Sequence, residues 1–133
     1  MPKEDYLLKY IEKLSRVIAA MLGFMEKGFP DESLRLADEL YTELLAIDIL
    51  TLEEMTELEF QQLLYKHNLT ISYLEYFSEI LLQTAKAYEE KQENAKARSF
   101  YQKALQTLLY LTEKDKTFSL EREDKIAALR KIN

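Results

Sequence analysis

The stretch "AYEEKQENAKARSFYQKAL", residues 87–105, decides the fold. A polar run in its middle separates two segments in which alanines and aromatic residues recur. In the second segment Ala97, Tyr101 and Ala104 follow in steps of four and three, which places them on one face of a helix. Small side chains on such a face let two helices approach closely. The stretch therefore predicts two antiparallel helices joined by a short turn.

Apolar residues repeat at helical spacing along most of the 133 residues. The chain has only two glycines and two prolines, whereas a sheet protein of this length needs many more turn residues. The fold class is therefore all-α, with few and long elements. We expect about six antiparallel helices in three hairpins, over residues 4–27, 31–47, 51–66, 70–91, 94–111 and 119–132. In the last of these, Ile126, Leu129 and Ile132 are expected to face inward.

Residues with strong end preferences mark where these helices begin and end. Gly28 is expected in the left-handed conformation after the first helix, and Asn68 after the third. A continuous helix through residues 66–70 remains an alternative. The expected N-caps are Asp31, Thr51 in a T-x-x-E capping box with Glu54, Asn94 and Ser119.

Length and composition indicate one domain over residues 1–133, since a globular domain of this size can bury a core without disulfide bonds or structural metal ions. The absence of cysteine excludes disulfides, thiolate metal sites and cysteine nucleophiles. Charged residues interrupt every N-terminal apolar run, so we expect no signal peptide and no membrane span. A cytoplasmic protein is the resulting expectation. The net charge is −6 and no stretch concentrates cations, which argues against a nucleic-acid partner.

Residues that could perform catalysis do not gather anywhere in the sequence. The one histidine, His67, has no glutamate or histidine three or four residues away, so it is expected at a helix end. The many glutamates fall between apolar positions and are expected to face water. Both glycines are isolated, which excludes a glycine-rich phosphate loop. We therefore predict a non-enzymatic protein with no catalytic, metal-binding or cofactor-binding residues and no cofactor.

Residues 78–111 resemble the tetratricopeptide repeat, a pair of antiparallel helices of about 34 residues. Ala85 and Tyr88 match the small and aromatic positions of its first helix, and Ala97, Tyr101 and Ala104 match its second. The chain departs from the pattern at Leu81, where the repeat favours tryptophan, and at Leu109, where it favours proline. The resemblance implies a right-handed α-α superhelix with a concave, partner-binding surface. The matching groove positions are Glu79, Leu82, Lys86 and Glu89.

The N-terminal run "DYLLKYIEKLSRVIAAMLG", residues 5–23, is similar to the start of a small family of uncharacterised bacterial proteins of this length. This second resemblance implies a bacterial origin, and it implies no activity and no site residues.

These observations favour a protein-protein interaction or scaffolding module whose protein or peptide partner is unknown. One alternative is a self-assembling structural homodimer, because a short solenoid leaves an apolar end uncovered. Another is a helical bundle that binds a small ligand between its helices. Four tyrosines lie outside the main apolar stripes of their expected helices: Tyr65, Tyr73, Tyr76 and Tyr110. They either border the core or form an exposed patch for a partner.

Overall fold

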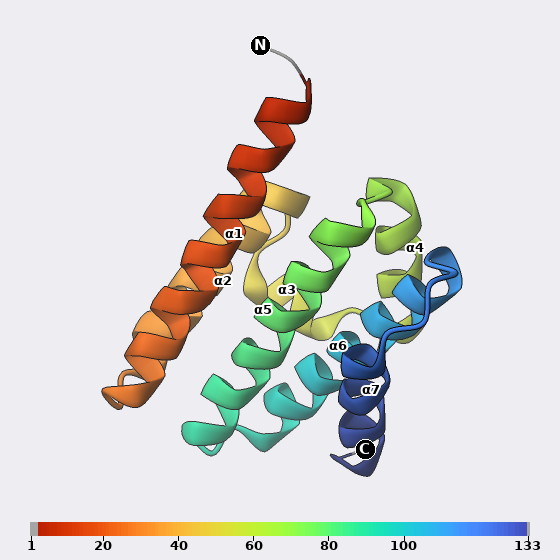
Figure 1. Ribbon diagram of the computed structural model, residues 1–133. Helices are drawn as coiled ribbons and strands as arrows, with labels where there is room; N and C mark the ends of the chain where they lie inside the picture. The colour runs from red at the N-terminus through yellow and green to blue at the C-terminus, as the bar shows by residue number, and fades with distance from the viewer. Residues whose placement is uncertain (1–2, 133) are drawn as a thin grey trace.

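The described part of the chain consists of helices and contains no strand, which confirms the all-α class. The structure is a computed structural model that describes residues 3–132, with side chains from residue 9 onward. Residues 1, 2 and 133 of the expected domain lie outside this range. Seven helices make up the described residues (Figure 1): α1 (Lys3–Glu26), α2 (Pro30–Leu45), α3 (Ile49–Glu54), α4 (Glu57–His67), α5 (Ile71–Glu90), α6 (Asn94–Lys114) and α7 (Leu120–Ile132).

The third expected helix is divided into α3 and α4, and the predicted capping box was wrong. Asp48 caps α3, and its carboxylate accepts a hydrogen bond from the Thr51 N–H at 2.8 Å. Thr51 therefore lies inside a helix that has already begun. The chain turns extended at Met55, and the capping box forms five residues later, between Thr56 and Glu59. The sequence contains the T-x-x-E signature twice, and only the second one opens a helix.

The remaining helix ends follow the expected residue chemistry, with two corrections. Asp31 is not the N-cap of α2, because Pro30 already occupies the first turn and Phe29 is the N-cap. Asn94 is the first residue of α6 and Glu93 is its N-cap. Asn68 ends α4 in the left-handed conformation, at φ 45°, which confirms the break between α4 and α5. The Ser119 hydroxyl accepts from the Arg122 N–H at 3.2 Å and so opens α7.

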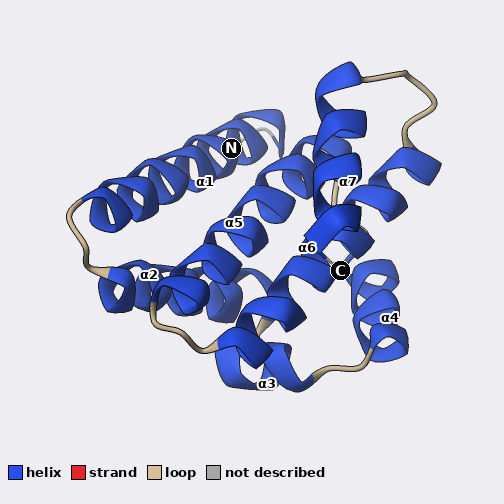
Figure 2. Ribbon diagram, turned by 90° about the horizontal axis from the view of Figure 1, so that it is seen from below, coloured by secondary structure: helices blue, strands red, loops and turns tan. Residues whose placement is uncertain are grey.

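Two helical hairpins dominate the fold, and α5 is the helix that joins them. α1 pairs with α2, α5 pairs with α6, and α5 also packs against both α1 and α2. α3 and α4 contact α6, while α7 packs on α6. Figure 2 shows α1 and α7 on one side of the molecule and α2, α3 and α4 on the other, with α5 and α6 between them.

Small residues determine how closely α5 and α6 pack. Ala85, Ala97 and Ala104 are at most 3% exposed, and their helices α5 and α6 form the most extensive helix-helix contact among the described residues. Without bulky side chains at these positions the two backbones can come near each other. The close α5–α6 contact predicted from the alanine spacing is therefore confirmed.

Aromatic rings connect the hairpins through one hydrophobic core. The Tyr41 ring of α2 packs against Phe77 of α5 and Phe100 of α6, with ring centroids about 6 Å apart. Phe60 of α4 stacks on Phe77 from another side. The buried Tyr41 hydroxyl hydrogen-bonds the Thr84 hydroxyl at 2.6 Å, so the one polar group at this contact is satisfied.

A buried lysine attaches the short helices to α6. Lys103 is 5% exposed, and its ammonium donates hydrogen bonds to the carbonyls of Glu53 (3.3 Å) and Met55 (3.0 Å). These carbonyls end α3, where positive charge is favourable. Burial lowers the pKa of Lys103, and the neighbouring Glu53 and Glu59 carboxylates oppose that shift. Lys103 thus holds the α3–α4 segment in place through its backbone.

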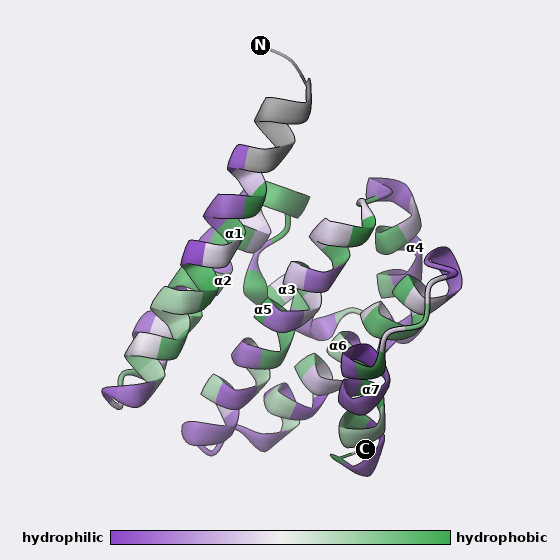
Figure 3. Ribbon diagram, viewed as in Figure 1, coloured by the Kyte–Doolittle hydropathy of each residue, from purple (hydrophilic) through white to green (hydrophobic). Residues whose placement is uncertain are grey.

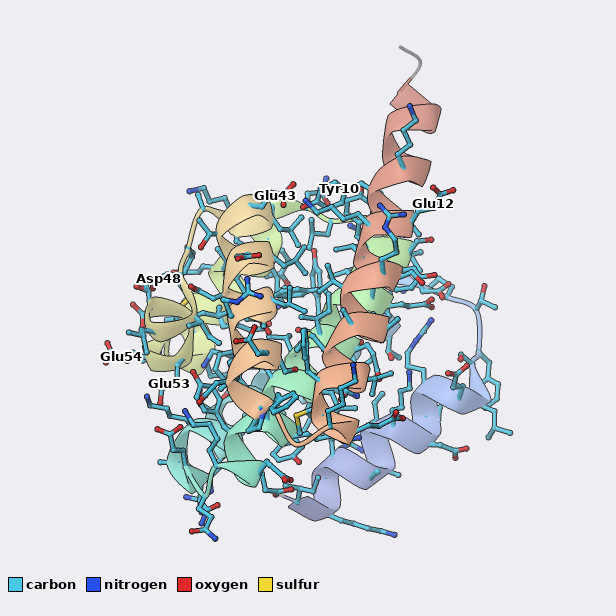
Figure 4. All side chains as sticks on the ribbon, turned by 90° about the vertical axis from the view of Figure 1, so that its left-hand side faces the viewer. Tyr10, Glu12, Glu43, Asp48, Glu53 and Glu54 are labelled. Atoms are coloured by element: carbon cyan, nitrogen blue, oxygen red, sulfur yellow. The ribbon has the colours of Figure 1, made fainter. Side chains whose placement is uncertain are left out.

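Polar residues cover the outside of the helices (Figure 3). The predicted solvated carboxylates lie there: Glu54, Glu57 and Glu59 are exposed. In Figure 4, Asp48, Glu53 and Glu54 lie along the edge of the molecule that α3 forms. The same view shows Tyr10 and Glu12 on opposite sides of α1. The four tyrosines outside the expected apolar stripes differ in burial. Tyr73 and Tyr110 are buried, Tyr76 is half-buried, and Tyr65 is 60% exposed.

Candidate functional site

An apolar pocket of about 180 Å³ opens between α5, α6 and α7. Its wall is formed mainly by leucine, isoleucine and alanine side chains from the three helices, with lysines among them. Ile132, at the end of α7, is 52% exposed. The lining residues are Ser78, Glu79, Leu82, Lys86, Tyr101, Ala104, Leu108, Lys125, Ala128, Leu129 and Ile132.

Three of the four groove residues predicted from the sequence line this pocket. Glu79, Leu82 and Lys86 lie on one face of α5 because their spacing of three and four residues matches the helical turn. Glu89 lies one turn further on and does not line the pocket. Its carboxylate accepts a hydrogen bond from the Tyr101 hydroxyl at 3.3 Å. Burial, together with the charge of Glu89, raises the pKa of Tyr101 to about 12, so this hydroxyl stays protonated as a donor.

A second hollow of about 300 Å³ adjoins the pocket on the side of α1. Ser15 and Ile18 of α1 form one wall, and Glu75, Tyr76 and Glu79 of α5 form the floor. Glu121 and Lys125 of α7 complete it, and both Glu79 and Lys125 belong to the two hollows at once. The pocket and this hollow therefore adjoin each other on either side of the Glu79–Lys125 ion pair, and together we call them the α5 groove.

The walls of the α5 groove repeat one pattern. α1 and α5 each begin a hairpin, and counted back from the hairpin link, Ser15 and Ile18 hold the same positions as Glu79 and Leu82. These residues face the groove in both helices. The two hairpins thus turn the same face of their first helices toward one side of the molecule.

A buried arginine positions α7, the third wall. Arg122 is 6% exposed, and its Nη2 lies 2.8 Å from an Asp115 carboxylate oxygen and 3.2 Å from one of Glu75. The hydrogen bond from Arg122 lowers the pKa of Asp115, so this carboxyl stays ionised at neutral pH. Ile126 and Leu129, on the apolar side of α7, are buried. Arg122 therefore ties α7 both to α5 and to the loop before it.

The charged residues of the groove are unequally paired. Lys125 lies between Glu79 and Glu121, with Nζ–Oε separations of 3.7 and 3.5 Å. Glu75 is paired with Arg122. Lys86 is exposed and forms no ion pair with any residue that the structure describes. It is a cation available to a ligand at the mouth of the pocket.

Several groove residues were not identified from the sequence. Ile132 was expected to face the core with Ile126 and Leu129, but it is half-exposed at the pocket. Lys125 and Ala128 were not predicted at all. The signal was present in α7, since residues 121, 125, 128 and 132 repeat at helical spacing. Which face of α7 meets α5 could not be decided, however, without the position of the helix.

The described residues contain no metal-binding cluster. Among residues 9–132, no group of three or more histidine, aspartate or glutamate side chains could hold a metal ion. His67 ends α4, as expected, and burial lowers its pKa. No helix within the described residues combines the length and apolar character required to cross a membrane. What the groove offers is an apolar pocket, charged side chains at its rim and rigid helical walls.

Comparison with protein-family models, with curated proteins and with solved structures gave no match to the chain.

Proposed function

We propose that the chain is a non-enzymatic, cytoplasmic protein-protein interaction or scaffolding module of the tetratricopeptide-like kind, whose α5 groove binds a segment of a partner. The observation that carries the proposal is the apolar pocket beside Leu82 and Lys86. Exposed apolar surface framed by polar groups is typical of sites that bind other proteins. Rigid helices on three sides would bind a partner without an ordering cost for the walls.

The order of helix contacts supports the tetratricopeptide-like part of this proposal. α1 packs on α2, both pack on α5, α5 packs on α6, and α7 packs on α6. In a stack of helical hairpins each unit contacts only its neighbours in this way. α3 and α4 then form an insertion between two repeats, and α7 covers the open end of the second.

The proposal can be tested by cross-linked pull-down from cells with the double variant Leu82→Asp/Lys86→Glu. Both changes alter the chemistry of the groove, so a partner recovered by the wild type should be lost. The matched control is Leu50→Asp/Lys66→Glu, which makes the same changes at exposed positions of α3 and α4 outside the groove. Circular dichroism should show that both variants fold. Equal recovery of the same partners by the wild type and the groove variant would contradict the proposal.

A second candidate function is homodimerisation through the opposite side of the molecule. Leu58 is 67% and Tyr65 60% exposed on α4, and Leu109 is 37% exposed on α6. Leu109 also lines a hollow of about 410 Å³ between α6 and the α3–α4 junction. Light scattering over a concentration series tests this directly: a dimer that Leu58→Asp disrupts supports it, and a monomer at every concentration rejects it.

A further inference from the structure

The two ends of the α5 groove differ in charge. Three glutamates and one lysine line the hollow beside α1: Glu75, Glu79, Glu121 and Lys125. Two lysines and one glutamate line the apolar pocket: Lys86, Lys125 and Glu79. Glu79 and Lys125 belong to both ends and pair with each other, so the ends differ by Glu75 and Glu121 at one and Lys86 at the other.

Ion pairs within the groove do not cancel this charge difference between its two ends. Glu75 shares the Arg122 guanidinium with Asp115, while Glu79 and Glu121 share Lys125. Four carboxylates at that end therefore face two cations. At the other end Lys86 remains without an ion-pair partner among the described residues. The groove thus presents excess negative charge at one end and an uncompensated cation at the other.

The size of the apolar pocket restricts what can enter it. A cavity of about 150 Å³ accommodates benzene, whereas pockets for whole small-molecule ligands begin at about 300 Å³. The pocket of about 180 Å³ matches one large side chain, such as leucine, methionine or phenylalanine. This favours a single anchoring residue of a protein partner over a complete metabolite.

We infer that the α5 groove binds an extended segment that carries one large apolar residue between a basic and an acidic residue. The apolar side chain fills the pocket, the acidic residue pairs with Lys86, and the basic residue faces Glu75 and Glu121. From Glu75 to Lys86 the α5 axis rises about 16 Å, at about 1.5 Å per residue. An extended chain advances about 3.3 Å per residue, so the two charges of the bound segment lie about five residues apart. The inference rests on the proposed function.

An extended segment suits this groove better than a helix. A bound helix presents a stripe of apolar residues at successive turns and needs a continuous apolar groove. The α5 groove has one apolar pocket with charged residues beyond it. Alternate side chains of an extended segment point the same way, so one anchor flanked by polar residues fits.

The test is selection from a phage-displayed library of random 12-residue peptides on the purified full chain. Wild type, Lys86→Glu and the control Lys66→Glu are selected in parallel, since Lys66 is an exposed lysine of α4 outside the groove. We expect the wild type and the control to enrich peptides with an apolar residue between opposite charges. Lys86→Glu should enrich a basic residue in place of the acidic one.

Fluorescence anisotropy on the best peptide then measures each contact. Replacing its apolar anchor by alanine should weaken binding by about tenfold or more, as expected for an apolar side chain leaving a pocket. Lys86→Glu should weaken binding of the same peptide, and Lys66→Glu should not. Enrichment that is identical in wild type and Lys86→Glu, peptides without an apolar anchor, or no enrichment at all would each overturn the inference. Loss of cellular partners in the groove double variant would still support the proposed function in those cases.

Discussion

The α1–α2 and α5–α6 hairpins are closed by the same turn but play different parts in the fold. Each link has three residues, 27–29 and 91–93. In each, the middle residue is left-handed, Gly28 at φ 80° and Gln92 at φ 63°. The Phe29 N–H donates to the Phe24 carbonyl at 2.8 Å, and the Glu93 N–H to that of Tyr88 at 2.9 Å. Both turns are therefore Schellman motifs.

The difference between the hairpins lies in how many sides of their first helix are covered. Within the described residues, the main contacts of α1 are with α2 and α5, and its Leu22 is 43% exposed. α5 is covered by α1 and α2 on one side and by α6 on another. When the two hairpins are aligned at their links, Lys13 corresponds to Phe77, Ser33 to Ala97 and Leu40 to Ala104. Lys13 and Phe77 differ in burial, whereas the other two pairs are equally buried and differ in their side chains. Equivalent positions should therefore respond unequally to mutation.

The largest contrast is expected between Phe77 and Lys13. Phe77 is fully buried between Tyr41 and Phe60, so Phe77→Ala should lower the free energy of unfolding by about 3–5 kcal/mol. Lys13 is paired with Glu43 at the surface, so Lys13→Ala should lower it by about 0–1 kcal/mol. Urea denaturation followed by circular dichroism measures both. Similar losses in the two variants would show that the hairpins are equally central.

The next contrast concerns the close contact of α5 with α6. Ala85 is fully buried and lines no part of the α5 groove, and Ala85→Leu should lower stability by about 1–3 kcal/mol because the helices would have to separate. The equivalent residue of the first hairpin is already large, Met21. Ala95→Leu, at an exposed position of α6, is the control and should change stability by no more than about 0.5 kcal/mol. Thermal melts of the two variants should therefore separate clearly, and coinciding melts would count against the tight contact.

Exchanging the left-handed residues tests the equivalence of the turns. A side chain in this conformation costs about 1 kcal/mol more than glycine. Gly28→Gln should therefore destabilise the protein by about 1 kcal/mol, and Gln92→Gly should stabilise it by up to the same amount. Chemical denaturation gives both values. If Gln92→Gly is destabilising, the second turn depends on contacts of the glutamine side chain.

A smaller effect is expected from Ser33, whose buried hydroxyl has no hydrogen-bond partner among the described residues. Its equivalent in the second hairpin is Ala97. Ser33→Ala removes the cost of burying a polar group, and it should stabilise the protein by about 0.5–1 kcal/mol. A raised urea midpoint with unchanged slope is the expected result. A lowered midpoint would indicate that the hydroxyl is bonded.

The weakest predicted effect concerns α7, which extends the second hairpin only. The pKa of Asp115 is lowered in the folded state by Arg122, so its contribution to stability is complete above the unfolded pKa of about 3.9. The contribution is lost as the pH falls through the lower, folded value. Urea midpoints between about pH 2 and pH 6 should fall less steeply for Asp115→Asn than for the wild type. Parallel curves would show that the pair does not hold α7.

Local residue chemistry accounts for the parts of the fold that were predicted. Pro30, Asn68, Thr70 and Ser119 act within one helical turn of their own position, so their helix ends were predictable. The capping box was misplaced because Thr51 and Thr56 carry the same signature. Choosing between them required the neighbouring Asp48, whose carboxylate had already begun α3.

The candidate site was predictable on one helix and not on its partners. Glu79, Leu82 and Lys86 were expected from the resemblance to the tetratricopeptide repeat, and their spacing of three and four residues places them on one face of α5. Lys125, Ala128 and Ile132 depend on how α7 rotates, and that is decided by Arg122 reaching Glu75 and Asp115. Lys103 was missed for a similar reason, because its carbonyl partners lie about fifty residues away along the chain.

Of the three hairpins predicted, the one expected over residues 51–91 does not form, because α3 and α4 pack on α6. From its sequence alone, this protein is determined to be all-helical, with short turns closing the α1–α2 and α5–α6 hairpins and a close contact through Ala97 and Ala104. These properties depend on neighbours three or four residues apart, and helical spacing places those neighbours together wherever the helix lies. The charge difference along the α5 groove, the apolar pocket and the docking of α7 were decided only by the tertiary structure. They join side chains from helices far apart in sequence, and no local rule specifies which faces of separate helices meet.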